Sequence, residues 1–331
     1  MRAFEYVTPK SKEQAVGLLS QNWGDTELLA GGTDLLALMK DDVVAPKRLV
    51  NVKSIAGLDA IGYNARTGLR IGALVRIADF ADNADVRKYY PTLARVADDA
   101  ASPQIRNQAT MAGNLCQRPR CWYFRNGFGL LAKDPQSGKS LVVEGDNRYH
   151  AILGNDGPAY FVSPSSIAPA LIAAGAKIRV FGPSGARELP LEKFYVIPKS
   201  ENEREHDLRS NEIVIEIVVP PPSGERFGHY EVRQKAEFDW PLATASVALK
   251  MSGNKVQAAR IVMGHVAPIP WVCDKYVEAT LLGQPLTETT ANAAGVVAAE
   301  KPGKSLGKNA YKIRLAHVAV KRALLQAVKE T

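Results

Sequence analysis

The stretch AGGTDLL at residues 30–36 decides how the first part of this chain folds. The apolar run Leu28–Ala30 predicts a short buried strand, and residues 35–39 follow a helical pattern. Two glycines between a strand and a helix let backbone N–H groups approach a ligand without a Cβ in the way. The stretch therefore predicts a strand, a glycine turn and a helix, the arrangement that exposes backbone amides to an anion.

A second stretch of small residues, RNQATMAGNL, occupies residues 106–115. Both stretches set glycine beside a hydroxyl and an amide or carboxylate side chain. Thr33 and Thr110 offer hydroxyl donors, and Asn114 can both donate and accept. A single Gly-Gly-Thr turn is more often structural than ligand-binding. Two such loops can clamp one elongated dinucleotide from both sides, although their spacing does not name the ligand.

The first stretch lies in a small α/β unit that we expect over residues 1–57. Ser11 and Gln14 have the spacing of a capping box, in which each satisfies an unpaired amide at a helix end. Apolar residues over 15–19 form the inward stripe of the helix that follows, and residues 48–52 predict a second strand.

A second unit is expected over residues 58–222. Its predicted elements are strands at 69–73, 159–162 and 177–181, a helix at 86–101 and an apolar helix through 171–172. We expect Pro91 to break the helix at 86–101 early. Residues 124–157 have poor periodicity and frequent Gly, Asp and Asn, which predicts a long loop or insertion.

Pro220-Pro221-Pro222 separates this unit from a third one, expected over residues 225–331, because a triple proline cannot continue a sheet. The elements predicted for the third unit are strands at 228–234, 243–251 and 256–266, and helices at 274–282, at 287–299 and from 309 onward. The last helix is amphipathic and basic. A solvated face is the more common reason for that pattern, and a docking surface for a partner is the alternative.

The composition is that of an ordinary folded protein. A length of 331 residues suggests two or three domains, and 46% hydrophobic with 23% charged residues excludes a disordered chain. The formal charge of +8 suits anionic ligands or an acidic partner, but does not by itself indicate nucleic-acid binding. Three cysteines cannot form a disulfide framework, and no apolar stretch approaches a membrane span. The first five residues lack the pattern of a signal peptide.

Several other functions lack their motifs. Gly138-Lys139-Ser140 and Gly303-Lys304-Ser305 end like a phosphate-binding P-loop, but the earlier glycine is absent and neither follows a convincing strand. No GxGxxG follows a strand, no GxSxG marks a hydrolase, and the five histidines have no metal-ligand spacing.

The two glycine stretches together resemble those of the FAD-binding medium subunit of the molybdenum hydroxylases, the family of xanthine dehydrogenase, aldehyde oxidoreductase and carbon monoxide dehydrogenase. The resemblance begins at Phe4-Glu5-Tyr6 and Pro9 and continues through RQKAEFDWPLATASV at residues 233–247 to the closing helix. Bacterial periplasmic-type aldehyde oxidoreductase subunits look nearest, since they also carry Ala at the position of Ala112.

The resemblance implies an α+β fold with a two-subdomain, PCMH-type FAD-binding domain like that of the vanillyl-alcohol oxidase and carbon monoxide dehydrogenase flavoproteins, followed by a smaller α+β C-terminal domain. Residues 28–35 would wrap the FAD diphosphate, and Thr110, Gly113 and Asn114 would contact the flavin side. Arg233 aligns with a basic residue near the flavin, with a strand-surface arginine as the alternative. The implied cofactor-binding residues are Leu28, Leu29, Ala30, Gly31, Gly32, Thr33, Asp34, Leu35, Thr110, Ala112, Gly113, Asn114, Ser166 and Arg233.

Ser102, Gln104 and Tyr123 are further candidates near the cofactor. The chain also departs from the family's pattern. Relatives commonly carry an Asp that binds the ribityl chain where this chain has Ser166, which makes tight FAD binding less secure.

A second departure concerns iron. Some relatives hold a [4Fe-4S] cluster on four cysteines after the second stretch, but only Cys121 matches one of those positions. Cys116 cannot complete the set, and Cys273 lies in another unit. We therefore predict no such cluster in this chain and no metal ligands.

The function that the resemblance implies is electron transfer in a heterotrimer. A large molybdenum-pterin subunit would oxidise an aldehyde or an N-heterocycle, and a small [2Fe-2S] subunit would pass the electrons to this FAD and on to an external acceptor. The alternatives are a free-standing flavoprotein oxidoreductase of the same fold and a flavin-free assembly module. We expect a cytoplasmic protein, or a periplasmic one exported together with a partner, and no nucleic-acid partner.

Overall fold

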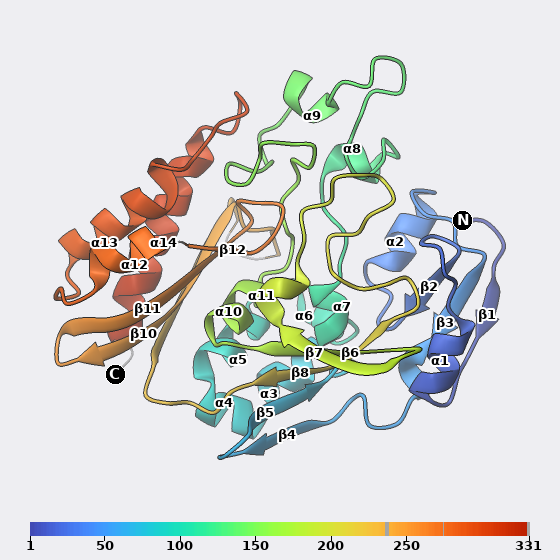
Figure 1. The fold of residues 1–331 in the computed structure, drawn as a ribbon, viewed down its shortest axis with the longest axis horizontal. Helices are drawn as coiled ribbons and strands as arrows, with labels where there is room; N and C mark the ends of the chain where they lie inside the picture. Colours follow the sequence, from blue (N-terminus) through green and yellow to red (C-terminus); the bar gives the residue numbers. More distant parts are fainter. Residues whose placement is uncertain (236–237, 274, 330–331) are drawn as a thin grey trace.

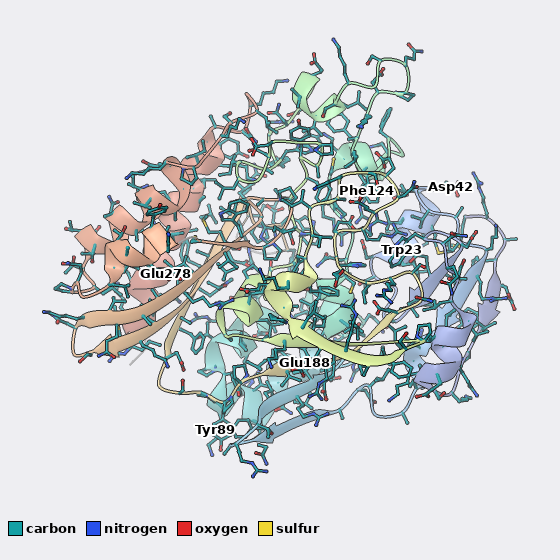
Figure 2. All side chains as sticks on the ribbon, viewed as in Figure 1. Trp23, Asp42, Tyr89, Phe124, Glu188 and Glu278 are labelled. Carbon is teal, nitrogen blue, oxygen red and sulfur yellow. The ribbon has the colours of Figure 1, made fainter. Side chains whose placement is uncertain are left out.

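The computed structural model describes residues 1–235, 238–273 and 275–329. Three β-sheets follow one another along the chain, one in each of the units expected from the sequence. Figure 1 shows the first unit in blue at one end of the long axis and the third unit in orange and red at the other. Side chains fill most of the space between the ribbons (Figure 2). Mixed helices and sheets of this kind confirm the α+β class.

The first unit contains a parallel three-stranded sheet in the order β1-β3-β2. Its elements are β1 (Glu5–Val7), α1 (Lys12–Leu18), β2 (Thr26–Leu29), α2 (Leu35–Lys40), β3 (Arg48–Asn51) and η1 (Val52–Ser54). The strand, glycine turn and helix predicted around residues 28–39 are present. Ser11 caps α1 by accepting from the Gln14 N–H, as predicted, but the Gln14 side chain accepts from Lys10 rather than from Ser11.

The second unit contains an antiparallel five-stranded sheet in the order β4-β5-β8-β6-β7. Its strands are β4 (Ile61–Asn64), β5 (Gly68–Gly72), β6 (Lys177–Gly182), β7 (Gly185–Pro190) and β8 (Ile213–Val219). Its helices are α3 (Ile77–Asp82), α4 (Ala84–Tyr89), α5 (Pro91–Asp98), α6 (Pro103–Arg106), α7 (Met111–Leu115), α8 (Trp122–Arg125), α9 (Leu141–Glu144), α10 (Ile167–Ala173) and α11 (Leu191–Phe194). Pro91 is the first residue of α5, so the single helix expected over 86–101 is two helices.

The strand expected at residues 159–162 is wrong. Ala159 and Phe161 are buried among loop residues rather than in a sheet, in a cluster that contains Phe124 and Leu131. The segment makes isolated backbone bonds, such as Ala151 N–H to Tyr160 O at 2.9 Å, so its apolar pattern reflects core packing without strand pairing. The long irregular segment expected over 124–157 is present, apart from the ends of α8 and the short α9.

The third unit is an antiparallel sheet in the order β12-β11-β10-β9, covered by helices (Figure 1). Its elements are β9 (Arg226–Val232), β10 (Ala243–Ser252), β11 (Lys255–Gly264), β12 (Trp271–Val272), α12 (Lys275–Leu281), α13 (Glu288–Gly295), η2 (Val296–Glu300) and α14 (Tyr311–Lys329). The predicted strands and helices are confirmed to within a few residues, except that Asp274 lies outside the described residues. A buried stripe on α14, including Ala316, Val320 and Leu324, packs on the sheet.

No helix among the described residues combines the length and the apolar character that crossing a bilayer requires.

Candidate functional site

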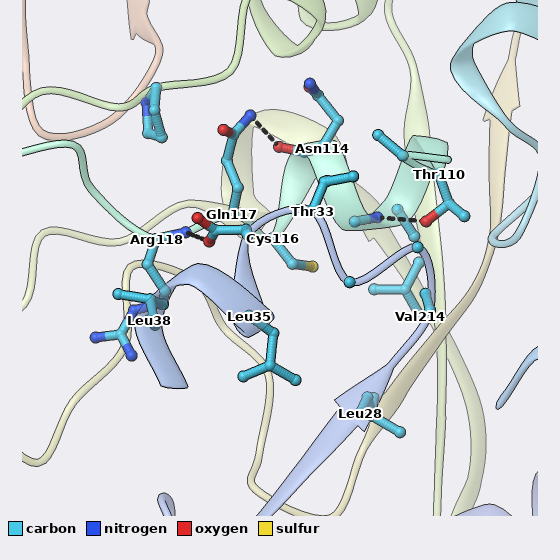
Figure 3. A pocket seen from close by; sticks show the side chains of 18 of the residues that line it. Leu28, Thr33, Leu35, Leu38, Thr110, Asn114, Cys116, Gln117, Arg118 and Val214 are labelled. Carbon is cyan, nitrogen blue, oxygen red and sulfur yellow. Dashed lines mark hydrogen bonds between the residues drawn. The ribbon is translucent and has the colours of Figure 1, made fainter. Parts of the chain in front are cut away.

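A cleft of about 520 Å³ lies where the three units meet, within the range of roughly 300–1,000 Å³ found for cofactor sites. The glycine turn after β2 and the stretch around α7 both line it, and the segment after β9 adds Arg233 and Trp240. Figure 3 draws Thr33 and Thr110, one from each stretch, among the residues that line the cleft. Gly32 and Gly113 therefore share one cleft, as the sequence predicted.

The two stretches touch through their backbones. A Cβ on Gly31 would lie 2.0 Å from the carbonyl oxygen of Gln108 and 3.0 Å from the Cα of Ala109. No side chain fits in that space, so glycine is required at position 31 for the two stretches to meet.

The first stretch presents backbone donors to the cleft. Gly32 adopts a left-handed φ of 72°, which turns the chain from β2 into α2. Among the backbone hydrogen bonds between described residues, none uses the N–H groups of Gly31, Gly32 or Thr33. Consecutive free N–H groups of this kind form a concave site for an anion such as a diphosphate.

The second stretch is held rigid by hydrogen bonds around α7. Thr110 caps α7, and its hydroxyl accepts from the Gly113 N–H at 3.1 Å. The Asn114 Oδ1 accepts from the Ser165 hydroxyl at 2.6 Å, and the Asn114 carbonyl accepts from Gln117 at 3.0 Å (Figure 3). The Asn114 Oδ1 has two acceptor sites and Ser165 takes one of them, so the other site and the amide NH₂ can contact a ligand.

Nearly all residues that the resemblance implied for the cofactor line this cleft. They are Leu28, Ala30, Gly31, Gly32, Thr33, Asp34, Leu35, Thr110, Ala112, Gly113, Asn114, Ser166 and Arg233. Leu29 does not, because alternate residues of a strand face opposite sides and Leu29 packs against Met39 and Leu49. Of the two further candidates before α7, Ser102 lines the cleft and Gln104 does not.

The Asp34 carboxylate is hydrogen-bonded and ion-paired to the segment that follows α7. Its Oδ2 accepts from the Arg118 N–H at 2.8 Å, and its Oδ1 lies 2.8 Å from Arg125 and 3.1 Å from Arg120. Sequence patterns placed Asp34 beside the cofactor but gave no sign of these arginines. Asp34 thus ties residues 118–125 to the glycine turn.

One wall of the cleft carries charges that sequence analysis missed. Arg204 lies over the ring of Trp23 at 4.7 Å and pairs with Glu27 at 3.0 Å. Burial lowers the pKa of Arg204 and raises the pKa of Glu27. His206 lies beside them, and burial lowers its pKa to about 4, so its ring is neutral at pH 7. These residues come from distant parts of the chain, and only the folded structure brings them together.

An aromatic residue stands at the rim. Trp240 is 44% exposed, and the Arg120 guanidinium lies 4.5 Å from the centre of its ring. The sequence indicates Tyr123 as the aromatic near the cofactor instead. Tyr123 does not line the cleft, and its hydroxyl accepts from the Asp146 N–H at 2.7 Å in the irregular segment.

Arg233 reaches the cleft from the third unit. Its Nε donates to Glu231 at 2.7 Å, and its Nη2 also contacts Glu231 and donates to the Asp99 carbonyl at 2.9 Å. Asp99 follows α5 in the second unit, so Arg233 joins the two units beside the cleft.

The one thiol among the described residues that line the cleft is not suited to nucleophilic catalysis. It belongs to Cys116, and burial raises the pKa of this thiol to about 12, which keeps it protonated. Within the described residues, no group of three or more His, Cys, Asp or Glu side chains is arranged to hold a metal ion. Cys121 contacts His150 at 3.1 Å in the irregular segment. The expected lack of a [4Fe-4S] cluster stays a prediction.

Family models match nearly the whole chain. Residues 2–222 match the FAD binding domain in molybdopterin dehydrogenase, and residues 228–327 match the CO dehydrogenase flavoprotein C-terminal domain.

Individual relatives agree with these matches. The aldehyde oxidoreductase FAD-binding subunit PaoB of Escherichia coli (strain K12) is 35% identical over 82% of this chain and 84% of its own. The carbon monoxide dehydrogenase medium chain of Hydrogenophaga pseudoflava is 30% identical over 97% of this chain and 96% of its own. The solved structure of the carbon monoxide dehydrogenase from that organism, in a form lacking the Mo-pyranopterin moiety, superposes with a TM-score of 0.77 at 28% identity and covers 99% of this chain and 98% of that one.

Proposed function

This chain belongs to the family of FAD-binding medium subunits of the molybdenum hydroxylases, and from that premise we propose that it passes electrons from [2Fe-2S] centres on a partner subunit to an external acceptor. Its cofactor is FAD, and it is an oxidoreductase subunit. The observation that carries the proposal is the contact between the two glycine stretches at one cleft, with free N–H donors on the first of them.

The residues present fit this cofactor. The N–H groups of Gly31, Gly32 and Thr33 would bind its diphosphate, and the Asn114 amide and Ser166 hydroxyl would contact the portion beyond it. Bound FAD supplies the redox chemistry, accepting and releasing one or two electrons. The residues of this chain hold the cofactor and set its electrostatic surroundings.

No residue of this chain need act as a general base or nucleophile under this proposal. The cationic groups along the cleft are held by carboxylates or carbonyls, as Arg118 is by Glu205 at 2.9 Å. Such paired charges are oriented before the cofactor binds, so they stabilise charge in the cleft without rearrangement. Trp240 lines the cleft and is partly exposed, so its ring would shield bound FAD from water.

We propose a small [2Fe-2S] subunit and a large molybdenum-pterin subunit as partners, with an aldehyde or an N-heterocycle as the substrate class of the large one. The names of the relatives support the substrate class and the presence of further subunits, since they are subunits of an aldehyde oxidoreductase, a xanthine dehydrogenase and a nicotine 6-hydroxylase. The external acceptor is the other proposed partner. We propose a cytoplasmic location, or a periplasmic one reached together with a partner.

Co-expression with the neighbouring reading frames tests the assignment. We expect two further polypeptides, iron and molybdenum to copurify with this chain, together with one FAD per chain by absorption. A chain that isolates alone and oxidises substrate without partners would favour a free-standing flavoprotein. A colourless chain that rejects added FAD would contradict the proposal.

A further inference from the structure

We propose that Glu231 is a positioning residue for the FAD site: it holds Arg233 on the cleft wall and supplies the buried counter-charge that sets the reduction potential of the cofactor. The inference rests on the proposed binding of FAD in this cleft. It concerns a residue that does not itself line the cleft.

The strand geometry places the two residues together. His229, Glu231 and Arg233 alternate along the chain, so they lie on one face of β9 and its continuation. Arg233 donates to Glu231 through Nε at 2.7 Å, and through Nη2 to both Glu231 and the Asp99 carbonyl. The guanidinium is therefore fixed from the third unit by Glu231 and from the second unit by Asp99.

Glu231 is nearly enclosed, because only 8% of its side chain is exposed. On its own strand, His229 Nε2 lies 3.3 Å from the second carboxylate oxygen, and His229 Nδ1 contacts the Ser246 hydroxyl at 2.8 Å. On β10, Thr244 is paired with Glu231 and also with Gly264 of β11, which sets His265 nearby.

His265 completes the surroundings of Glu231. Its Nε2 contacts the carbonyl of Pro164, another cleft residue, at 3.3 Å. Behind it, the buried Lys312 amine donates to the His265 carbonyl at 2.8 Å. The groups that face Glu231 are thus one arginine and two histidines, with a lysine one step further away.

Arg233 and Glu231 carry opposite charges in direct contact at the cleft wall. Burial raises the pKa of Glu231, but the contacts with His229 and then Arg233 outweigh it and lower the pKa to about 2, so Glu231 is a carboxylate at pH 7. Burial lowers the pKa of His265 to about 4, so that ring is neutral. Arg233 carries a positive charge that Glu231 balances at hydrogen-bond distance. Removing one member of a buried ion pair leaves the other charge uncompensated in a weakly screened environment.

An unbalanced charge on the cleft wall would shift the reduction potential of the cofactor in a direction set by the sign of that charge. Reduction brings electrons into the cleft, so an added positive charge on the wall favours the reduced cofactor and an added negative charge disfavours it. Loss of Glu231 leaves the Arg233 cation unbalanced, and loss of Arg233 leaves the Glu231 carboxylate unbalanced. The two losses therefore shift the potential in opposite directions.

The test is a spectroelectrochemical titration of the FAD-loaded full chain and three variants. We expect Glu231→Gln to move the midpoint potential to more positive values and Arg233→Gln to more negative ones. Glu225→Gln is the matched control, since Glu225 also pairs with a cation, Lys250 at 3.4 Å, but does not line the cleft. It should leave the potential unchanged. Shifts in the same direction for both test variants, or no shift in either, would overturn the inference.

A double variant separates an effect of charge on the potential from an effect of misfolding. Glu231→Gln with Arg233→Gln removes both charges, so its potential should lie between those of the single variants. If Glu231→Gln does not fold, a potential of Arg233→Gln that equals or exceeds the wild-type value overturns the inference. A general packing defect would not give opposite signs. Failure of the wild-type chain to bind FAD would instead contradict the proposed function.

Discussion

Gly31 and Gln108 lie in backbone contact, so close that a Cβ on Gly31 would stand 2.0 Å from the Gln108 carbonyl oxygen. The contact joins a glycine turn of the first unit to the loop that leads into α7 of the second. The shape of the cofactor cleft depends on it, because the turn and the second stretch line one cleft and touch at this point.

Replacing Gly31 by alanine should therefore disrupt the cleft. The new methyl group meets backbone that cannot move as a side chain can, so we expect a loss of about 3 kcal/mol or more in stability and loss of bound FAD. The ratio of flavin to protein absorption and the thermal midpoint measure the two effects. Gly17→Ala is the control, because nothing lies within 4 Å of a Cβ there and alanine favours the helix α1. Full FAD content in Gly31→Ala would refute the steric argument.

Asp34→Asn should loosen residues 118–125. The substitution replaces charge-assisted bonds to Arg118, Arg120 and Arg125 by weaker ones, at a cost of about 1–3 kcal/mol. We expect faster proteolysis of that segment and weaker FAD binding by fluorescence titration. Asp41→Asn, on an exposed carboxylate just after α2, should change neither. Equal behaviour of the two variants would mean that Asp34 does not tie the segment down.

Removing the aromatic rim should expose the cofactor. In Trp240→Ala the stacking partner of Arg120 is lost and water reaches the cleft more easily. We predict faster FAD dissociation and stronger quenching of flavin fluorescence by iodide. The exposed Tyr276 on α12 does not line the cleft, so Tyr276→Ala serves as control. Unchanged quenching in Trp240→Ala would show that Trp240 does not shield the cofactor.

Acid should destabilise the folded chain well above the pKa of its carboxylates. Burial lowers the pKa of His150, His206 and His265 to about 4, below the ordinary value of 6.5. Between these values the unfolded chain binds more protons, so stability falls as pH falls, by roughly 3 kcal/mol per histidine at most. Glu27, whose pKa burial raises, acts in the opposite direction. Urea unfolding from pH 7 to pH 4 measures the combined change in the free energy of unfolding. A free energy that does not change over this range would contradict the prediction.

Local patterns predicted much of this fold, because they depend on neighbours in sequence. The strand, turn and helix around Gly31 needed only glycines and apolar spacing, and Pro91 marked a helix boundary by its missing N–H. The same reasoning wrongly predicted a strand at residues 159–162, since an apolar run is equally consistent with burial among loops.

The charged parts of the site lay beyond sequence patterns. Glu231 holds an arginine two residues away, which the strand period alone would allow, but its burial depends on β10 and β11. Arg118, Arg120 and Arg204 reach the cleft through long-range contacts that no spacing encodes. Gly31 and Gly113 were placed in one cleft from sequence because their residue types suit one ligand.

Hydrogen–deuterium exchange with and without FAD shows whether the two glycine stretches hold one FAD between them. We expect FAD to slow amide exchange at residues 31–33 and at residues 110–114 together, with the same concentration dependence. Protection of only one stretch, or of neither, in a chain that has bound FAD would contradict this expectation.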